Sequence, residues 1–315
     1  MRFLDYVRQK EAEGEVCVMK KIGISCASVL KQYGIERGLE ICKKSGFDAV
    51  DMGLERYVLG DEIYGGSEDA FVSHFTKIRE KAESLELEIS QTHGRCATYF
   101  ENDEEHNEKI RRVSELDLKA SSILGSPACV IHFINSTRWG KQPAEVMREV
   151  SAQMFEDLIP YAEQYQVKIA LETFGAARVS GARIRDFFAD PVEFQMQFDR
   201  MKTTYKTMCV DTGHTHEAES FWVPAPEEMI RILGSEISIL HLHDNNSHWD
   251  DHLLPGMGNI KWPAVFEALE DVGYNGVYNF ELAMRFGCML EEFVGFAGKY
   301  LRTFVDNKGD LKRVV

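Results

Sequence analysis

The 315-residue sequence contains no apolar segment of the roughly 18 residues that a membrane-spanning helix requires. Its first residues, MRFLDYVRQK, also lack the apolar stretch of a signal peptide, and Glu11, Glu13 and Glu15 follow at once. We therefore expect neither a membrane partner nor a secretory leader, and we predict a cytoplasmic protein.

Basic residues are scarce in this chain. Lys and Arg total 36 against 51 Asp and Glu, which gives a formal net charge of −15. A surface that binds DNA or RNA needs clustered positive charge to displace counterions from the phosphates. The charge balance therefore argues against a nucleic-acid partner, although it leaves room for a local basic pocket.

Paired cysteines are also absent. The seven cysteines are odd in number, widely scattered and form no Cys-x-x-Cys motif, so they predict neither a disulfide framework nor a structural zinc knot. Reduced cytosolic thiols are the simplest interpretation, and Cys129 and Cys209 lie in apolar runs that suit small buried side chains. No repeat, linker or low-complexity segment divides the chain, so a single globular domain is expected.

Short apolar runs alternate with amphipathic stretches along the chain. Runs of four or five apolar residues are typical of parallel strands buried on both faces. Eight such runs occur, at 22–25, 49–52, 89–92, 129–133, 169–173, 208–211, 239–243 and 277–281. Helices are predicted between them, at 35–45, from 67, and at 107–124, 143–165, 191–201, 226–233, 263–272 and 290–304.

Eight successive strand–helix units predict an α/β fold, a single (β/α)8 TIM barrel over residues 21–306. Residues 1–20 are then an N-terminal extension and residues 307–315 a C-terminal tail. A doubly wound open sheet is disfavoured, because no Gly-rich phosphate fingerprint follows the first strand. The stretches 175–190 and 244–261 are expected to be long irregular loops at the catalytic end of the barrel.

Acidic residues and histidines gather where the predicted strands end. In a closed barrel these ends meet at one mouth, where the active site of a TIM barrel lies. Carboxylates buried there without countercharge are costly, and a divalent cation held by oxygen and imidazole ligands resolves the conflict. Any one of these residues could be a hydrogen-bonded rim residue, but their recurrence on successive strands indicates a metal site. They are His93, His132, Glu172, Asp211, His214, His241, His243 and Glu281.

The seventh predicted strand contains two histidines, either of which could be the metal ligand. Residues two apart point to the same face of a strand, so His241 and His243 lie one layer apart. His243 comes later and is expected nearer the mouth, which makes it the predicted metal ligand. His241 is expected to pack in the barrel or to support the ligands.

These residues stand in motifs that resemble the xylose isomerase-like TIM-barrel superfamily, which includes sugar isomerases and epimerases, inosose dehydratases and endonuclease IV. The resemblance extends from Ile22 to Phe304. The motifs are Leu171-Glu172-Thr173, Val210-Asp211-Thr212-Gly213-His214, His241-Leu242-His243-Asp244, His252-Leu-Leu-Pro-Gly256-Met-Gly258-Asn-Ile260-Lys-Trp262 and Phe280-Glu281.

In the epimerase branch the resemblance implies one divalent metal, Mn, Co, Mg or Zn, held by Glu172, Asp211, His243 and Glu281. It also implies that Glu172 and Glu281 flank the substrate and exchange a proton across it through an enediolate. The chemistry is sound on general grounds, because a metal on adjacent carbonyl and hydroxyl oxygens acidifies the C–H between them. Two carboxylates on opposite sides can then act as general base and general acid.

Endonuclease IV has a three-zinc site, and the residue types of that site are all found here. They resemble the set His93, His132, Glu172, Asp211, His214, His243, Asp250, His252 and Glu281. More than one zinc is therefore compatible with the sequence, although the acidic composition argues against DNA as a partner. In sugar enzymes His93, His132, His214, Asp250 and His252 would instead contact the substrate.

The predicted substrate is a small sugar, sugar phosphate or cyclitol. Trp139 and Phe174 are candidates for stacking on its ring and Arg95 for binding a phosphate or carboxylate, although loop packing and a surface ion pair are the ordinary alternatives. Beside an isomerase or epimerase, the same opening step fits an inosose dehydratase-type lyase, and a C-glycoside-cleaving subunit is a further alternative. The resemblance also leaves a homo-oligomer open.

Overall fold

The computed structural model describes residues 19–133, 143–179 and 182–310. Its strands are β1 (Ile22–Ser25), β2 (Ala49–Gly53), β3 (Glu88–Cys96), β4 (Ala128–His132), β5 (Lys168–Glu172), β6 (Ala176–Val179), β7 (Ala182–Arg185), β8 (Lys206–Asp211), β9 (Ile237–His241) and β10 (Tyr278–Phe280). Its α-helices are α2 (Ala27–Tyr33), α3 (Ile35–Lys44), α4 (Glu68–Ser84), α5 (Glu104–Leu124), α6 (Ala144–Tyr165), α7 (Pro191–Arg200), α8 (Thr212–Ala218), α9 (Pro226–Leu233), α10 (Trp262–Asp271) and α11 (Leu290–Asp306).

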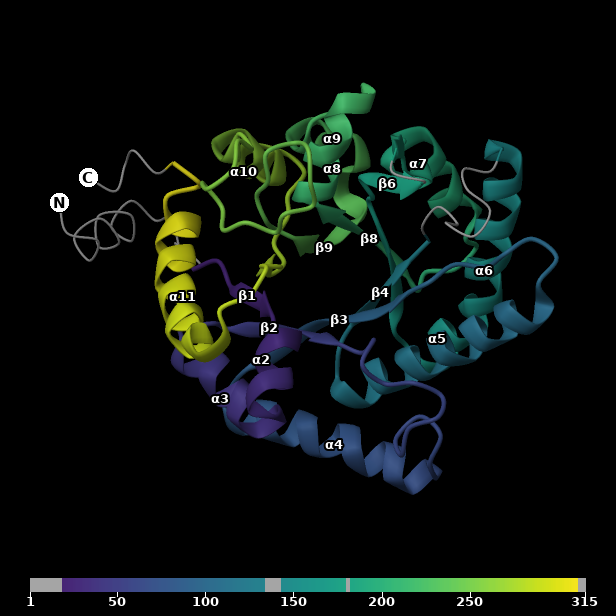
Figure 1. Cartoon of the computed structure of the whole chain (residues 1–315), viewed down its shortest axis with the longest axis horizontal. Coiled ribbons are helices and arrows are strands. Elements are labelled where there is room, and N and C mark those ends of the chain that lie inside the picture. The colour runs from purple at the N-terminus through teal and green to yellow at the C-terminus, as the bar shows by residue number, and fades with distance from the viewer. Residues whose placement is uncertain (1–18, 134–142, 180–181, 311–315) are drawn as a thin grey trace.

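Eight of the strands form one parallel sheet in the order β10-β1-β2-β3-β4-β5-β8-β9. The two edge strands meet just beyond β9, where the Leu242 N–H donates to the Asn279 carbonyl at 2.9 Å and the Glu281 N–H donates to the Leu242 carbonyl at 3.2 Å. Helices surround the strands, from α3 and α4 through α5 and α6 to α11 (Figure 1). The chain therefore folds as a TIM barrel, and the eight predicted strands are its eight barrel strands.

Residues of β4, β5, β8 and β9 divide between two separate apolar clusters. Cys129 and Ile131 of β4 belong to the large cluster, which also contains residues of the surrounding helices. Val130 belongs to a small cluster with Ala128, Ala170, Cys209 and Ile239, which fills the barrel interior. Because side chains alternate along a strand, His132 faces the same interior one layer nearer the carboxyl end. The same alternation carries Glu172, Asp211 and His241 to this layer.

One loop prediction is wrong. The stretch 175–190 is not irregular, because β6 and β7 pair as an antiparallel hairpin and a 3-10 turn follows at Phe187–Ala189. The sequence of β7, Ala-Arg-Ile-Arg, alternates apolar and basic side chains, which is the pattern of a partly exposed strand. The stretch 244–261 is irregular, as predicted, apart from one bridge between Asp244 and Leu253.

Two short helices, α2 and α8, were not predicted, and each directly follows a barrel strand. Helix α8 begins at Thr212, and the Asp211 carboxylate caps it by accepting the His214 N–H at 2.6 Å. Asp211 thus ends β8 and caps α8, and these two roles fix its side chain at the mouth of the barrel. No helix among the described residues has the length and apolar content to cross a bilayer, and the six cysteines in this part of the chain are free thiols.

Candidate metal centre

Four potential metal ligands meet at the carboxyl end of the barrel. One atom each of Glu172, Asp211, His241 and Glu281 lies within 4.8 Å of the others. The His241 Nδ1 atom lies 2.7 Å from Glu172 Oε1 and 3.2 Å from Glu281 Oε2. These residues end β5, β8 and β9 or directly follow β10, so the barrel register itself assembles the group. We call Glu172, Asp211, His241 and Glu281 the central group.

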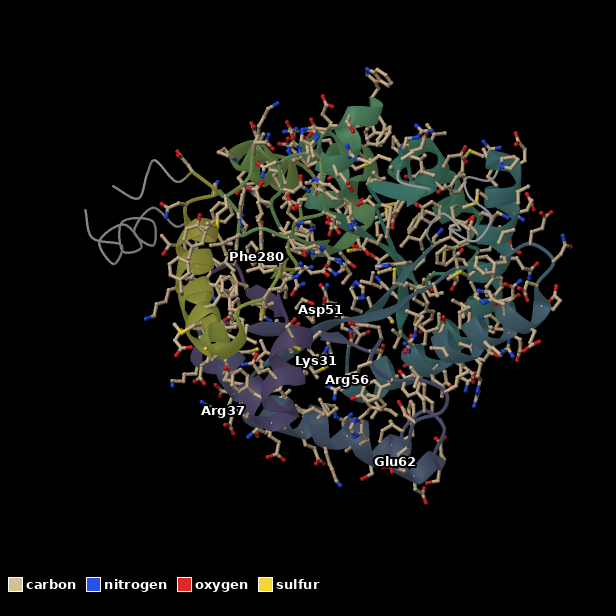
Figure 2. The ribbon with its side chains drawn as sticks, in the orientation of Figure 1. Lys31, Arg37, Asp51, Arg56, Glu62 and Phe280 are labelled. Atoms are coloured by element: carbon tan, nitrogen blue, oxygen red, sulfur yellow. The ribbon has the colours of Figure 1, made fainter. Side chains whose placement is uncertain are left out.

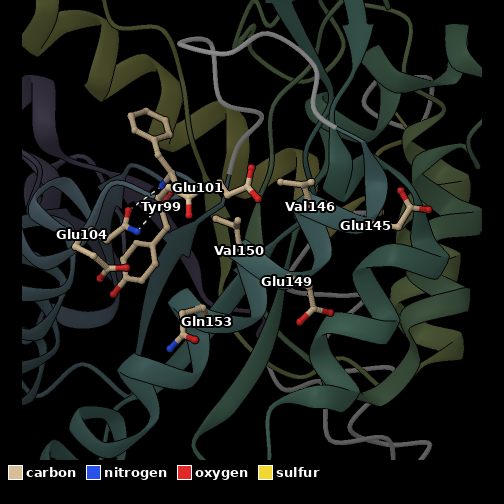
Figure 3. A pocket seen from close by; sticks show the side chains of 11 residues that line it. Tyr99, Glu101, Glu104, Glu145, Val146, Glu149, Val150 and Gln153 are labelled. Carbon is tan, nitrogen blue, oxygen red and sulfur yellow. Dashed lines mark hydrogen bonds between the residues drawn. The ribbon is translucent and has the colours of Figure 1, made fainter.

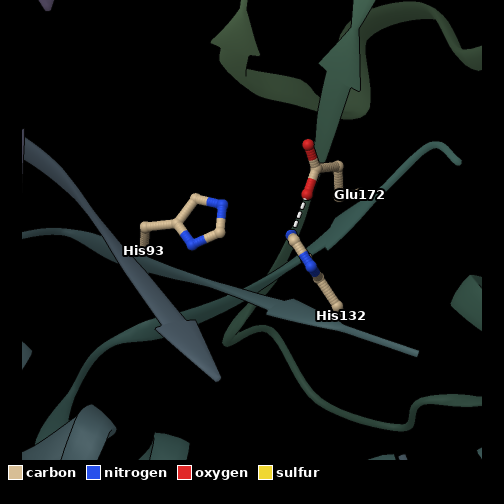
Figure 4. Close-up of side chains that lie close together, drawn as sticks. All are labelled: His93, His132 and Glu172. Atoms are coloured by element: carbon tan, nitrogen blue, oxygen red, sulfur yellow. Dashed lines mark ion pairs between the residues drawn. The ribbon is translucent and has the colours of Figure 1, made fainter. Parts of the chain in front are cut away.

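Two further donor groups flank the central group. His93 and His132, from the neighbouring strands β3 and β4, join Glu172 in one of them. Figure 4 shows the His132 ring directed at the Glu172 carboxylate, with the His93 ring beside them. His214, Asp250 and His252 form the other, in which Asp250 Oδ2 lies 3.0 Å from His252 Nε2 and 3.5 Å from His214 Nε2. These three groups contain eight of the nine predicted donors.

The ninth predicted donor, His243, belongs to none of these groups but lies against members of two of them. Its Nε2 atom is 3.0 Å from Asp211 Oδ1, and its ring stacks on that of His252 with centroids 4.0 Å apart. Strand β9 ends at His241, so the two-residue alternation that pointed to His243 no longer applies beyond it. The geometry favours His241 as the histidine of the central group. A Cβ atom at Gly213 would overlap the His243 ring, which explains the glycine in Asp-Thr-Gly-His.

Carboxylates and histidines compensate one another throughout the centre. Burial raises the pKa of Glu172, but His132 and His241 outweigh it and hold that pKa well below its ordinary value. Burial likewise lowers the pKa of His132, while the facing Glu172 carboxylate outweighs burial and raises the pKa to about 10. The pKa of Glu281 is lowered because His241, His93 and His252 more than offset its burial. Without metal, these acids are ionised and paired with protonated imidazoles.

The donor set suits a divalent cation. Glu172 Oε2 and His132 Nε2 have only each other as a polar partner, and His132 Nδ1 is buried without a hydrogen-bond partner among the described residues. Burying such atoms without a partner is costly, and a cation would satisfy them. Mixed carboxylate and imidazole donors fit Zn, Mn or Co, with deprotonation of the histidines on binding. The residues therefore fit the metal that the sequence led us to expect.

Asp244 organises the irregular segment 244–261, which carries Asp250 and His252. Its fully buried carboxylate accepts hydrogen bonds from the N–H groups of Asn245, Gly256 and Ile260 and from the Trp262 indole, at 2.8 to 3.2 Å. The Asp244 backbone also pairs with Leu253 in both directions. This anchor holds a long loop without secondary structure against the mouth. Asp244 stands in the motif His241-Leu242-His243-Asp244, but the sequence alone predicted no role for it.

The predicted substrate contacts have different surroundings. Phe174 is half-buried beside two donors, with its ring centroid 5.2 Å from that of His132 and 4.6 Å from that of His214. Trp139 lies outside the described residues. Arg95 is engaged elsewhere, because its guanidinium donates to the backbone carbonyls of Glu55 and Tyr57 at 2.6 and 2.5 Å. The structure thus gives Arg95 a role in fixing the segment that follows β2.

Behind Arg95 lies a buried carboxylate. The Asp117 side chain is fully buried, accepts the Tyr64 hydroxyl at 2.7 Å and lies 3.6 Å from the Arg95 guanidinium. Burial outweighs both contacts and raises the pKa of Asp117 from 3.8 to about 6. An acid with a raised pKa favours folding while it is protonated, and this contribution is lost as pH rises through the folded-state pKa.

We expect the free energy of unfolding of the wild type, relative to Asp117→Asn, to fall by about 3 kcal/mol as pH rises from about 4 to above 6. The asparagine keeps an oxygen that accepts the Tyr64 hydroxyl and does not ionise. Urea unfolding of both proteins between pH 4 and 7.5 measures the difference. Asp69→Asn, at an exposed position of α4, is the control and should show no such trend. A difference independent of pH would contradict the prediction.

A cavity of about 290 Å³ opens beside the central group. Its lining includes the donors His93, His252 and Glu281, the hydroxyls of Ser25 and Ser28, and the charged side chains of Glu55 and Arg285. This volume is near the lower limit for small-molecule sites. Sequence reasoning missed Ser25, Ser28 and Glu55, which carry no motif, because only the closed barrel brings the ends of β1 and β2 next to Glu281.

A second pocket, of about 410 Å³, lies outside the donor groups. It is formed by the residues after β3 and the first turns of α6, and it contains none of the predicted site residues (Figure 3). Its charged lining is acidic, from Glu101, Glu104, Glu145 and Glu149. The candidate site is therefore the smaller cavity, because the donor atoms open into it.

Fold and site together define a TIM-barrel protein whose mouth gathers histidine and carboxylate side chains. Residues 39–286 match the family described as xylose isomerase-like TIM barrel. The chain belongs to this family, as its motifs suggested.

Individual relatives are distant. An uncharacterized protein of Sinorhizobium fredii is 27% identical over 173 residues, 54% of this chain and 51% of that protein, so the chain spans about half the length of this relative. An inosose isomerase of Bacillus velezensis is 24% identical over 276 residues, 83% of this chain and 88% of that one. A crystal structure of the IolI protein with a bound zinc atom matches with a TM-score of 0.68 and 18% identity, over 92% of this chain and 98% of that chain.

Proposed function

We propose that the chain is a divalent-metal-dependent isomerase or epimerase that acts on a small sugar or cyclitol. One observation carries the proposal: Glu172 and Glu281 approach the same His241 nitrogen from two strands, beside a cavity into which Glu281 opens. The similarity to an inosose isomerase supports the substrate class, and the zinc atom of the structural neighbour supports the metal.

The metal would be held by the central group, Glu172, Asp211, His241 and Glu281. This set replaces His243 of the predicted set with His241, for the geometric reasons given above. Asp211 is fully buried, and its backbone and side-chain contacts to α8 leave it little freedom, so it suits a fixed ligand. Glu281 keeps 23% of its side chain exposed, so it suits contact with a substrate.

The bound metal would polarise a carbonyl and a neighbouring hydroxyl of the substrate and so acidify the C–H between them. Glu172 and Glu281 could then hold and return the proton, since both carboxylates lie within 3.2 Å of the same His241 nitrogen at the proposed metal site. Phe174 offers an apolar surface next to His132 and His214. Ser25, Ser28, Glu55 and Arg285 offer hydrogen-bond partners to the hydroxyl groups of a polyol.

The same first step serves a lyase. Proton abstraction next to a carbonyl, followed by loss of hydroxide, would give an inosose dehydratase, and the residues named above would keep their roles. A C-glycoside-cleaving subunit would use the same barrel with a partner chain. The identity of the product therefore decides among these reactions once proton exchange is established.

A second candidate function is a metal-dependent phosphodiesterase of the endonuclease IV type. It is favoured by the three donor groups, which resemble a site for three zinc ions and two of which share Glu172. The net charge of −15 argues against a DNA substrate, because phosphates must be bound by a basic surface. Metal content separates the candidates: three zinc ions per chain favour the phosphodiesterase and one ion favours the isomerase.

The test is exchange of solvent deuterium into substrate. Metal-free protein is reloaded with Mn²⁺, Co²⁺, Mg²⁺ or Zn²⁺ and incubated in D₂O with a panel of ketoses and inososes. We expect deuterium at the carbon next to the carbonyl of at least one compound, and loss of this exchange with excess EDTA. A bis-aryl phosphodiester assayed in parallel tests the second candidate. Hydrolysis of the diester without exchange on any sugar would overturn the isomerase proposal.

A further inference from the structure

A buried carboxylate lies beneath the central group without an evident partner. Asp51, near the middle of β2, is fully buried, and neither of its carboxylate oxygens has a hydrogen-bond partner among the described residues. Figure 2 shows Asp51 within the ring of helices, whereas Arg37 and Glu62 lie on its outer side. A buried carboxylate without a partner costs several kcal/mol, so its presence calls for a physical explanation.

The ring of His241 faces the Asp51 carboxylate. The Asp51 Oδ2 atom lies 3.5 Å from His241 Nε2, and both side chains are fully buried. The two residues come from strands separated by β10 and β1 in the sheet, so the contact crosses the barrel interior. The other ring nitrogen, Nδ1, faces Glu172 and Glu281. One nitrogen of His241 is thus directed at the central group and the other at Asp51.

Cys209 is the alternative partner for the His241 ring, since its Sγ atom also lies within 4.8 Å of a ring nitrogen. Cys209 is a fully buried free cysteine. A neutral thiol is a weak hydrogen-bond acceptor and a carboxylate is a strong one. Asp51 is therefore the group that can orient the ring.

We propose that Asp51 is a positioning residue that holds His241 in the tautomer with hydrogen on Nε2 and thereby presents the Nδ1 lone pair to a divalent metal. The inference rests on the proposed metal site. Metal-binding histidines commonly donate their second ring N–H to a carboxylate, which fixes the ring and strengthens it as a ligand. Asp51 reaches His241 from below the site, so it does this without contacting the substrate.

The experiment measures zinc affinity of the full-length protein by competition with a chromophoric chelator, after metal removal. Asp51→Ala is expected to raise the Kd for zinc by about 10–100-fold, the range for loss of such a partner. Asp51→Asn keeps an oxygen that can accept from Nε2–H, so a smaller rise is expected. If several zinc ions bind, we expect the substitution to raise the Kd of only one of them.

Two matched controls share the buried interior of the barrel. Gln91 is the register partner of Asp51 on β3 and has a buried amide nitrogen without a hydrogen-bond partner among the described residues. Gln91→Leu and Cys209→Ala are expected to leave the zinc Kd within about twofold of the wild type. Circular dichroism and thermal unfolding in EDTA show whether each variant is folded before metal is added.

The outcomes separate the two proposals. If the wild type binds no zinc, the metal site and the role of Asp51 both fail. If the wild type binds zinc and Asp51→Ala binds it equally well, only the role of Asp51 fails. If Asp51→Ala does not fold, Asp51→Asn decides alone, and an unchanged Kd in that variant overturns the inference. An equal weakening by Cys209→Ala would assign the role to the thiol instead and would also overturn it.

Discussion

At saturating divalent metal, replacing Glu172 or Glu281 with glutamine is expected to slow proton exchange into the substrate by about 10²–10⁴-fold, the usual contribution of a general acid or base. The glutamine side chain keeps the size of the glutamate but cannot accept the substrate proton. Both glutamates lie against His241 Nδ1, and Glu281 also lines the cavity. Deuterium wash-in, followed by NMR or mass spectrometry, measures the effect.

The matched control is Asp211→Asn. Asp211 belongs to the same central group, but it is fully buried and its carboxylate accepts the His214 N–H, so it is placed to bind metal and not to reach the substrate. Excess metal should restore exchange in this variant to a large extent and should not restore it in the two glutamate variants. Full exchange in Glu172→Gln and Glu281→Gln would refute the two-glutamate mechanism. If excess metal restored proton exchange equally in all three variants, the glutamates would act only as metal ligands.

Asp244→Ala is expected to lower the free energy of unfolding by about 3 kcal/mol or more. The substitution leaves four donors without their acceptor, three backbone N–H groups and the Trp262 indole, and each buried unsatisfied group costs about 1–3 kcal/mol. The segment that carries Asp250 and His252 loses its anchor, so metal binding by the group of His214, Asp250 and His252 should weaken as well. Urea unfolding and zinc titration measure the two effects.

Asp251→Ala is the control for this loop. Asp251 lies in the same segment and is only partly buried, so its loss should change the free energy of unfolding by no more than about 0.5 kcal/mol. If Asp244→Ala unfolded at the same urea concentration as the wild type, the four hydrogen bonds would not be what holds the segment. Loss of stability with unchanged zinc binding would separate the anchor from the donor group.

The barrel could be predicted from the sequence because its signals are local. Each barrel strand is a short apolar run, and each predicted helix shows its own periodicity or starting residue, as at Ser67, whose side chain caps α4 by accepting the Ala70 N–H. The hairpin β6–β7 was missed because eight residues of mixed character resemble a loop until they pair. Helix α8 was missed because its seven residues are too few to show a period.

The sequence alone determined that carboxylates and histidines stand at the strand ends, since position along a strand is a local property. It could not decide between His241 and His243, because that choice depends on where β9 ends and which ring faces Glu172 across the barrel. Nor could it pair Asp51 with His241, which are 190 residues apart in numbering (241 − 51) and meet only inside the closed barrel. Spacing along the chain gives each side chain its level in the barrel. Closure of the sheet, which brings opposite strands face to face, decides which side chains touch.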